Sequence, residues 1–212
     1  MTTQYGFYHN NDECIGCKMC IVSCKDKNDL PLGEKFRRVY DFGGGTWASP
    51  TDGTFSPKDF FLYSVSVACM HCAAPICMAS CPVEAITKRD DGIVSIDQNT
   101  CIGCGACVTA CPLGAPYMST ATGTARKCDL CKDLIDKGED PVCVASCPLR
   151  CLEYGELAEL QRAHGTVDSV APLPKDAGTG PSIVFTRHRF NPDGTLPGKV
   201  LNAPEEVESA TV

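Results

Sequence analysis

The chain lacks an excess of positive charge. Its 212 residues carry 19 Lys and Arg against 26 Asp and Glu, which is a formal charge of −7. Nucleic-acid-binding domains usually present a basic face, so this balance argues against nucleic acid as a partner. Long apolar runs are also missing, since the longest candidate, FFLYSVSVACM, is shorter than the roughly 20 residues that a membrane helix needs. We therefore expect no direct membrane span.

Targeting and catalytic motifs are scarce as well. The opening MTTQYGFYHNNDEC has neither the basic region nor the apolar region of a secretory signal, so we expect no export address in this sequence. The sequence has no nucleophile–base constellation, and DFGGGTW lacks the strand–helix context of a phosphate-binding loop. We expect no catalytic residues, and no turnover by this chain alone.

Cysteine, by contrast, is abundant. The sequence has 17 in 212 residues, about 8%, near the level that indicates a scaffold held by more than its hydrophobic core. Sixteen of them fall into four groups, with spacings 2-2-3, 2-4-3, 2-2-3 and 2-11-3. In order, the groups are Cys14, Cys17, Cys20 and Cys24; Cys69, Cys72, Cys77 and Cys81; Cys101, Cys104, Cys107 and Cys111; and Cys128, Cys131, Cys143 and Cys147.

Three chemistries use cysteine at this density. Disulfides need an oxidising compartment, and the odd count and missing secretory signal argue against them. Structural zinc uses two C-x2-C pairs a dozen or more residues apart, which only the fourth group resembles. Three thiolates at successive three-residue steps suit a [4Fe–4S] cluster, while the fourth cysteine, often followed by Pro, binds the other cluster of a pair. Because Cys81, Cys111 and Cys147 each precede Pro, the pattern favours iron–sulfur clusters.

The residue before the second cysteine of a group is suited to a tight turn. Gly16 and Gly103 lack a Cβ, which lets the backbone approach a cluster and turn its amides toward sulfur. His71 takes this place in the second group, and histidine tolerates a left-handed backbone better than most residues. We interpret His71 as a turn residue with a local hydrogen bond rather than as a metal ligand.

Because the fourth cysteine of each group binds the cluster of another group, the groups work in pairs. Between the second and third groups, a strand at 85–89, a DDG turn and a strand at 93–97 resemble the middle of a bacterial two-cluster ferredoxin. The segments after Cys147 and before Cys14 parallel those after Cys81 and before Cys101, so the first and fourth groups form a second such unit. The predicted ligands are set one (Cys14, Cys17, Cys20, Cys147), set two (Cys24, Cys128, Cys131, Cys143), set three (Cys69, Cys72, Cys77, Cys111) and set four (Cys81, Cys101, Cys104, Cys107).

The sequence therefore predicts an α+β fold of two interleaved bacterial-ferredoxin-like units, with an inserted β-hairpin and an extended C-terminal tail. Four clusters held in two adjacent pairs suit a relay of single electrons, and their binding also contributes folding free energy. The predicted domains are an outer unit of residues 1–24 and 128–155, a hairpin insertion at 25–68, an inner unit at 69–127, and a helix with an extended partner-binding tail at 156–212.

The insertion carries its own expectations. We expect strands at 37–42 and 60–67 on either side of a glycine-rich turn. Trp47, which is the single tryptophan, belongs either to a small satellite core or to a partner contact. We interpret residues 112–127, further along the chain, as a loop.

In the tail, the sequence predicts a helix at 156–164 that stops at Gly165. An extended, proline-rich stretch follows. Residues 182–190, SIVFTRHRF, form either a strand or a partner-binding arm. Because so long a tail has little core of its own, we expect it to wrap a neighbour.

Two further features concern the metal sites. Cys151 is the unassigned cysteine, and we interpret it as a small buried residue because Cys147 has the group spacing and the following Pro. Positive charge near a cluster raises its potential, so a basic surface beside the first and fourth groups either tunes sets one and two or is merely solvated. The positive residues in question are Lys18, Lys25, Lys27, Arg126, Lys127, Lys132 and Arg150.

These motifs together resemble one known family. The chain is similar to the iron–sulfur B subunit of the dimethyl sulfoxide reductase family of molybdopterin oxidoreductases. The resemblance spans residues 1–175 and includes MTTQYGF, FRRVY, the four cysteine groups, CPLR and VAPLPK. In some members, Trp replaces one cysteine of the third group and that cluster becomes [3Fe–4S]. Since Cys104 keeps this position, the resemblance implies four [4Fe–4S] clusters.

The resemblance also implies partners. Such a subunit relays electrons between a donor, often a quinol-oxidising membrane anchor, and a catalytic subunit that alone holds molybdopterin. That catalytic partner usually bears a twin-arginine signal. We therefore expect a location peripheral to the cytoplasmic membrane, either exported with the partner or cytoplasmic. Nothing in the sequence selects the substrate.

Three other functions stay open. In the first, the chain is a relay subunit of a formate dehydrogenase or hydrogenase complex, although some of those carry a C-terminal membrane helix that this sequence lacks. Alternatively, it is a free polyferredoxin that serves several enzymes by diffusion. A non-redox metal-binding module is the third alternative, for which four ferredoxin-type groups are more than is needed.

Overall fold

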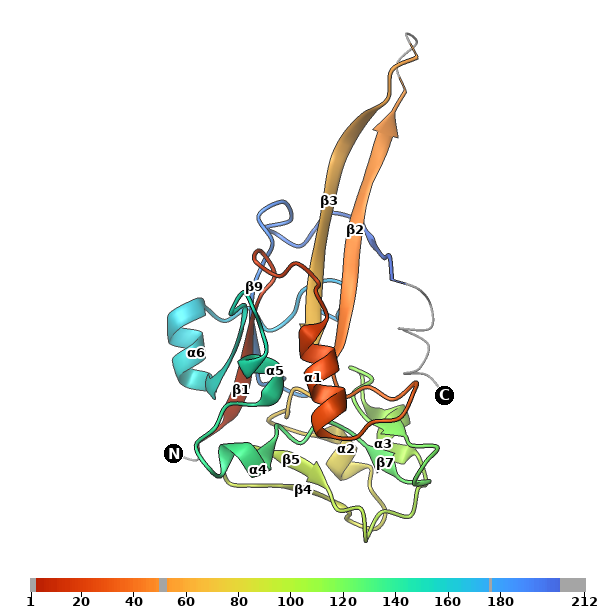
Figure 1. Cartoon of the computed structure of the whole chain (residues 1–212), viewed down its shortest axis with the longest axis vertical. Coiled ribbons are helices and arrows are strands. Elements are labelled where there is room, and N and C mark those ends of the chain that lie inside the picture. Colours follow the sequence, from red (N-terminus) through yellow and green to blue (C-terminus); the bar gives the residue numbers. More distant parts are fainter. Residues whose placement is uncertain (1–2, 50–52, 176, 203–212) are drawn as a thin grey trace.

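The fold places short helices and strands around two long strands. The structure is a computed structural model that describes residues 3–49, 53–175 and 177–202. Figure 1 shows a body of short elements from which the β2–β3 pair projects. In chain order the elements are β1 (Tyr5–Asn10), α1 (Met19–Lys27), β2 (Arg38–Ala48), β3 (Ser56–Val67), α2 (Ile76–Ala79), β4 (Ile86–Lys88), β5 (Val94–Ile96), α3 (Ala106–Ala110), β6 (Tyr117–Met118), β7 (Ala125–Arg126), α4 (Lys132–Ile135), α5 (Val142–Ala145), β8 (Leu152–Glu156), α6 (Leu157–His164), β9 (Ile183–Thr186) and β10 (Lys199–Val200).

β1 lies at the centre of a three-stranded sheet with the order β8-β1-β9. It pairs antiparallel with β8 and parallel with β9, and Phe7 has a partner on each side. Residues 6–9 are all buried, as expected for a strand that is covered on both faces. Leu160 of α6 packs against Tyr8 and Val184, and Figure 1 shows α6 beside this sheet. This sheet joins the N-terminal strand to two strands from the last third of the sequence.

The C-terminal part of the chain folds back on its own body. The helix prediction is confirmed, since α6 ends at His164 and Gly165 has a φ of 89°. Of the two interpretations of residues 182–190, the strand is confirmed for β9, where Ile183, Val184 and Phe185 are fully buried. The tail thus has more core than we expected, because β9 completes the sheet around β1, and its predicted partner contact stays a prediction.

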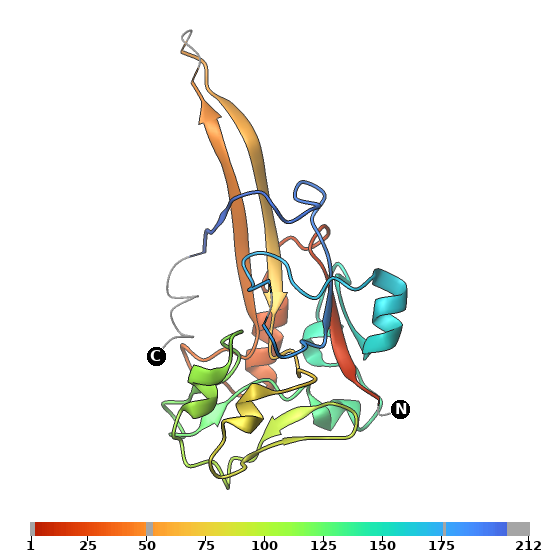
Figure 2. The ribbon, with the colours of Figure 1, turned by 180° about the vertical axis from the view of Figure 1, so that it is seen from behind.

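β2 and β3 form a long antiparallel pair, with Arg38 opposite Val67 and Ala48 opposite Ser56. Figures 1 and 2 show from opposite sides that this pair extends well beyond the rest of the molecule. β10 pairs with β2 at its other edge, so the sheet has the order β10-β2-β3.

The prediction of a turn at the three glycines of the insertion is wrong. Gly43–Gly45 lie within β2, and the register shifts between Gly44 and Thr46. Glycine is used here for close approach rather than for reversal, because a Cβ at Gly44 would overlap the carbonyl oxygen of Pro197. Trp47 is 67% exposed, so the satellite-core interpretation of this residue is also wrong.

Two small sheets complete the fold. β4 and β5 form the antiparallel pair predicted between the second and third cysteine groups, with Thr87 opposite Ser95. β6 and β7 pair across Tyr117 and Arg126, so residues 112–127 contain a short hairpin and are not simply a loop. In the described part of the chain, no helix has the length and apolar character needed to cross a membrane.

Candidate metal centres

Left-handed residues shape the loops that carry the cysteines. Gly16 and Gly103 have φ of 66° and 70°, and α1 and α3 begin after Lys18 and Gly105, which are also left-handed. Such a residue reverses the chain sharply just before a short helix, which turns successive cysteines toward one side. In the second and fourth groups, the last cysteine follows a short helix. These helices are α2 and α5, and they begin after Pro75 and Pro141.

The structure brings the thiols of set one to one cavity. Cys14, Cys17, Cys20 and Cys147 line it, and the residues outside the set that share its wall include His9 and Cys151. Apart from Cys17, which is exposed, these side chains are buried or half-buried. The cavity is bounded by α1, by β1 and by the loop that precedes β8.

Set three lines a second cavity. It is formed by the four cysteines of the set, Cys69, Cys72, Cys77 and Cys111. His71 and Lys127 lie in the same wall. His71 has a φ of 42° and its Nδ1 accepts a hydrogen bond of 2.9 Å from the Val94 amide. His71 is thus a turn residue as predicted, although its hydrogen-bond partner is distant in sequence.

Set four lines a third cavity, with Cys81, Cys101, Cys104 and Cys107 brought together between α3 and β4. Its remaining wall consists of glycine and of apolar residues such as Ile86 and Ile96, with no charged side chain. Cys104 is exposed, like Cys17 of set one. The chain therefore contains two sets that reach the surface.

Set two is the most deeply placed. Cys24, Cys128, Cys131 and Cys143 are all buried. Burial, together with the nearby charges of Cys143 and Cys131, raises the pKa of Cys24 to about 12. Burial likewise raises the pKa of Cys131 to about 11, with Cys143 again adding to the effect. That these cysteines affect one another's pKa shows that the four thiols of the set lie in one neighbourhood.

The donor chemistry fits an iron–sulfur cluster. Burial raises the pKa of Cys77 in set three to about 12, and the pKa values of Cys20, Cys107 and Cys128 are also raised mainly by burial. A buried thiol becomes a stable thiolate only when a metal compensates its charge, so metal binding releases protons. Grouped soft thiolates in apolar walls select iron–sulfur clusters or zinc. The assignment of each cysteine to a particular cluster remains a prediction.

The four sets lie one after another in space through the apolar interior of the protein. One apolar cluster contains Cys14, Cys20 and Cys147 of set one with Cys143 of set two. A second contains Cys24 and Cys128 of set two with Cys69 and Cys111 of set three. A third contains Cys77 of set three with Cys81, Cys101 and Cys107 of set four. The sets therefore follow one another in the order one, two, three, four, and the exposed cysteines belong to the first and last.

Several of the predicted positive residues have partners within the protein, and two of them also lie beside the outer sets. Lys18 lines the set-one cavity, and the charge of Lys27 opposes the raised pKa of Cys131 in set two. Lys25 donates to the carbonyls of residues 30, 31 and 34, Lys27 lies 2.8 Å from Asp133, and Arg126 lies 3.6 Å from Glu34. Lys127 is buried, but it lines the set-three cavity and donates to the carbonyls of Val94 and Cys128. Lys127 thus lies between Cys128 of set two and the cavity of set three, and its predicted effect on the outer sets stays a prediction.

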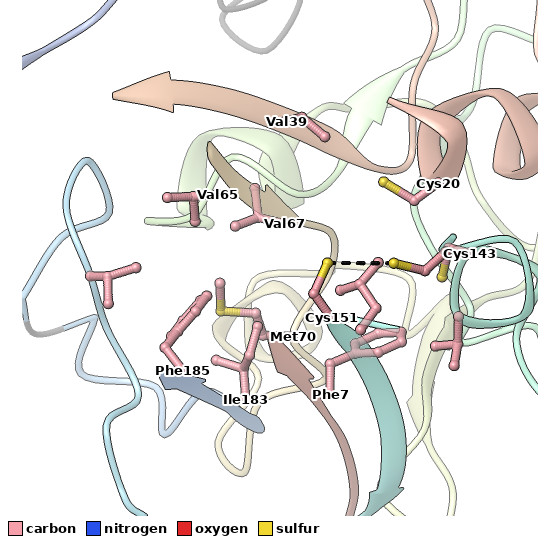
Figure 3. Close-up of a cluster of buried hydrophobic side chains, with 14 of the residues drawn as sticks. Phe7, Cys20, Val39, Val65, Val67, Met70, Cys143, Cys151, Ile183 and Phe185 are labelled. Carbon is pink, nitrogen blue, oxygen red and sulfur yellow. Dashed lines mark hydrogen bonds between the residues drawn. The ribbon is translucent and has the colours of Figure 1, made fainter. Parts of the chain in front are cut away.

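Cys151 is buried as predicted, but it is not remote from the metal site. Its Sγ lies 3.4 Å from Cys147 Sγ, which is the contact drawn as a dashed line in Figure 3. Its thiol, the Cys14 thiol and the His9 ring offer ligand atoms within 4.8 Å of one another. Hydrogen bonds with Cys151 and His9 lower the pKa of Cys14 to about 4. Set one thus has a fifth thiol beside it, which the group spacing did not indicate.

The cysteine-lined cavities and the small α+β body define the chain as an iron–sulfur protein. Residues 60–157 match a family described as the 4Fe-4S dicluster domain, and residues 11–28 match a 4Fe-4S binding domain. The chain is 44% identical over 208 residues to a probable anaerobic dimethyl sulfoxide reductase chain of Escherichia coli (strain K12), covering 98% of this chain and 100% of the relative.

Two further relatives extend the comparison. With the same coverage, the chain is 43% identical to the B subunit of the anaerobic dimethyl sulfoxide reductase of Escherichia coli (strain K12). It is 34% identical to the thiosulfate reductase electron transfer subunit of Salmonella typhi, covering 92% of this chain and 97% of that subunit. This protein therefore belongs to the family of iron–sulfur B subunits of dimethyl sulfoxide reductases and related reductases.

Proposed function

We propose that this chain is the electron-transfer subunit of a reductase complex, relaying single electrons to a molybdopterin-containing catalytic subunit. The observation that carries the proposal is the series of four thiol sets, which runs through three successive apolar clusters. When bound, [4Fe–4S] clusters supply one-electron transfer at potentials that the surrounding protein sets. The chain's own residues bind them, exclude water and fix their order. The full-length similarity to reductase subunits supports this role.

Four clusters are proposed, held by the four sets as predicted: set one by Cys14, Cys17, Cys20 and Cys147; set two by Cys24, Cys128, Cys131 and Cys143; set three by Cys69, Cys72, Cys77 and Cys111; and set four by Cys81, Cys101, Cys104 and Cys107. The cavities that the structure forms around sets one, three and four support this assignment. Because only sets one and four have an exposed cysteine, they suit entry and exit of electrons.

Two interleaved ferredoxin-like units are proposed for the body. The pairing of β4 with β5 supports an inner unit at 69–127, and the pairing of β8 with β1 supports an outer unit of 1–24 with 128–155. Each pair joins the strand after one cysteine group to the strand before another. α1 continues to Lys27 and β8 to Glu156, so these two elements cross the proposed boundaries by one to three residues.

A catalytic subunit is the partner proposed for the projecting hairpin. Trp47, Phe55, Phe60 and Leu62 are all exposed on or near β2 and β3. A groove of about 590 Å³ beside them is lined by Trp47, Phe60 and Leu201. Exposed apolar groups gathered in this way mark protein interaction sites, and the curated relatives are subunits of reductases.

The hairpin proposal is tested by paired substitutions. Trp47→Ser with Phe60→Ser is expected to leave the iron content unchanged while reducing co-purification with the molybdenum subunit. Phe61→Ser is the matched control, because Phe61 is 2% exposed and its loss destabilises the fold itself. Undiminished co-purification of the double variant would assign the partner contact to another surface.

The donor and the substrate are proposed at the level of class. The donor is a quinol acting through a membrane anchor, or another reductant, and the complex lies at the cytoplasmic membrane, either exported with a twin-arginine-bearing partner or facing the cytoplasm. Relatives act as subunits of dimethyl sulfoxide, thiosulfate and polysulfide reductases. The chain itself contributes the relay rather than the substrate site.

The competing functions differ in what is expected to co-purify with this chain and in what reduces it. A reductase subunit co-purifies with molybdenum, whereas a free polyferredoxin is isolated alone with the same iron content. A formate dehydrogenase or hydrogenase subunit would be reduced by formate or hydrogen in its complex. Anaerobic purification of the native complex, with metal analysis and reduction by each donor, therefore separates these possibilities.

A further inference from the structure

A fully buried arginine lies at the start of the hairpin, immediately before β2. Arg37 is 2% exposed and has no carboxylate within ion-pairing distance in residues 3–49, 53–175 and 177–202. Its Nη1 donates to Ser66 Oγ at 3.2 Å, and its guanidinium carbon lies 4.7 Å from the centre of the Phe7 ring. Its Nη2 is buried and, within the described residues, has no hydrogen-bond partner.

Burying an unpaired guanidinium destabilises the folded protein unless a negative charge lies nearby. A buried cation loses its hydration, and proteins ordinarily pair a buried guanidinium with a carboxylate. The groups that contact Arg37, which are the hydroxyl and the carbonyl of Ser66 and the ring of Phe7, carry no net negative charge. The fold nevertheless keeps Arg37 inside, which indicates that the compensating charge comes from a group bound to the protein.

The groups around Arg37 are cysteines of two sets. Burial lowers the pKa of Arg37, but the negative charge of Cys143, Cys20, Cys128 and Cys24 raises it by more, so the net shift is upward. Cys20 belongs to set one, while the other three belong to set two. Figure 3 shows Cys20, Cys143 and Phe7 at one buried cluster. Arg37 therefore lies at the step between the first two sets.

Ser66 connects this charge to one ligand directly. Ser66 on β3 is 1% exposed, accepts from Arg37 and lies 3.3 Å, Oγ to Sγ, from Cys20. Its hydroxyl proton is free to point at the sulfur because the guanidinium donates to its oxygen. The two residues thus form a short series of hydrogen bonds from the cation to the Cys20 thiolate.

We propose that Arg37 is the shared buried counter-cation of the clusters in sets one and two, and that it raises both of their reduction potentials. Reduction makes a thiolate-bound cluster more negative, so a fixed cation nearby favours the reduced form. The low dielectric of the interior makes this effect larger than that of an exposed lysine. The proposal rests on the proposed function, since it requires clusters at these two sets.

The charge is local to one part of the relay. At set three, the corresponding buried cation is Lys127, which lines the cavity and lowers the otherwise raised pKa of Cys77. The wall of set four contains no charged side chain. Arg37 is thus expected to act on the first two clusters and to leave the cluster of set four unchanged.

Two substitutions at Arg37 separate charge from shape. Arg37→Gln removes the cation, whereas Arg37→Lys keeps a positive charge without the planar fork. Arg38→Gln is the matched control, because Arg38 is the next residue, is also buried and donates instead to the Gly114 carbonyl. The full-length proteins would be purified anaerobically, assayed for iron and titrated by EPR. Cys17→Ser and Cys104→Ser variants would identify the signals of sets one and four.

Arg37→Gln is expected to shift the reduction equilibrium of two clusters at least tenfold toward the oxidised form, which is about 59 mV for a one-electron step. Arg37→Lys should retain most of the wild-type potential, and Arg38→Gln should leave these two clusters unchanged. If Arg37→Gln instead loses iron from sets one and two while Arg37→Lys keeps it, the counter-cation role is equally supported.

Unchanged potentials in Arg37→Gln with full iron content would overturn the proposal, as would equal loss of iron in the Gln and Lys variants. Ser66→Ala gives a second measure, because it should lower the potential of the set-one cluster and spare set four. A wild-type chain without iron–sulfur clusters would refute the proposed function itself, which is distinguishable from either result.

Discussion

Single glycines determine how closely the backbone can approach a metal site. Gly103 has a φ of 70°, and a Cβ there would overlap the carbonyl oxygen of Gly123. Gly105 has a similar φ of 76°, but the nearest atom to its Cβ would be Met118 Sδ at 4.0 Å. The two positions share the backbone strain and differ in the space available.

We therefore expect Gly103→Ala to disturb set four far more than Gly105→Ala. Both substitutions incur the cost of a left-handed non-glycine residue, which is of order 1–3 kcal/mol. Only Gly103→Ala also forces two backbone segments apart. Iron content and the EPR signal of set four in the two variants measure the difference, and equal losses would contradict the steric account.

Cys151 provides a second test at the scale of one residue. Because its sulfur lies 3.4 Å from that of Cys147, it is placed to replace a lost ligand of set one. We expect Cys147→Ala to retain more iron than the double variant Cys147→Ala/Cys151→Ala, and Cys151→Ala alone to retain the wild-type amount. Identical iron contents in the single and double variants would show that Cys151 does not bind the cluster.

At the scale of elements, the sheet around β1 depends on a close contact. Gly6 and Gly155 are register partners in β1 and β8. A Cβ at Gly6 would lie 2.5 Å from the Ser182 carbonyl oxygen, whereas at Gly155 the nearest atom would be 3.8 Å away in Leu160. β9 thus reaches β1 closely only because position 6 has no side chain.

Gly6→Ala is expected to lower the free energy of unfolding by about 1–3 kcal/mol, as overpacking usually does. Gly155→Ala should be neutral or stabilising by about 0.5–1 kcal/mol, because it removes flexibility from the unfolded chain. Thermal unfolding of the two iron-loaded variants gives both values. A stable Gly6→Ala protein would mean that β9 is not fixed against β1.

The sequence predicted elements well where the signal was local. The strands at β4 and β5 and the Gly165 stop of α6 follow from short patterns around a turn. The glycines of β2 were misinterpreted as a turn, because only the folded chain shows Pro197 and Phe61 packed against them. β9 could not be assigned with certainty, because its partner, β1, lies at the other end of the chain.

At the scale of the whole molecule, cysteines hold the core together. Each of the three apolar clusters that link the sets contains cysteines from two sets. When the metal is removed, these buried thiols must either remain protonated or leave the interior. The binding free energy of the clusters is therefore folding free energy for the entire chain.

Anaerobic removal of iron with a chelator is accordingly expected to abolish the cooperative thermal transition and the near-UV circular dichroism. Both should return together when iron and sulfide are restored. A well-ordered iron-free chain with the same melting temperature would contradict this expectation, since it would show that the apolar clusters suffice alone.

The cysteine groups could be predicted from the sequence because each is a local spacing. The position of Arg37 beside them could not. Arg37 lies near cysteines of α1, α5 and the loop before α4, which only the fold brings together. Lys127 was named from the sequence as a neighbour of set two, but only the fold shows that it also lines the cavity of set three.

The proposed relay depends on four clusters that lie in series in one chain. Iron, acid-labile sulfide and zinc should be measured on the anaerobically purified full-length protein, together with the EPR spectrum of the reduced form. We expect about sixteen irons per chain, four for each of four clusters, and magnetic coupling between neighbouring [4Fe–4S] centres. Zinc in place of iron, or iron for only two uncoupled clusters, would contradict the proposed relay.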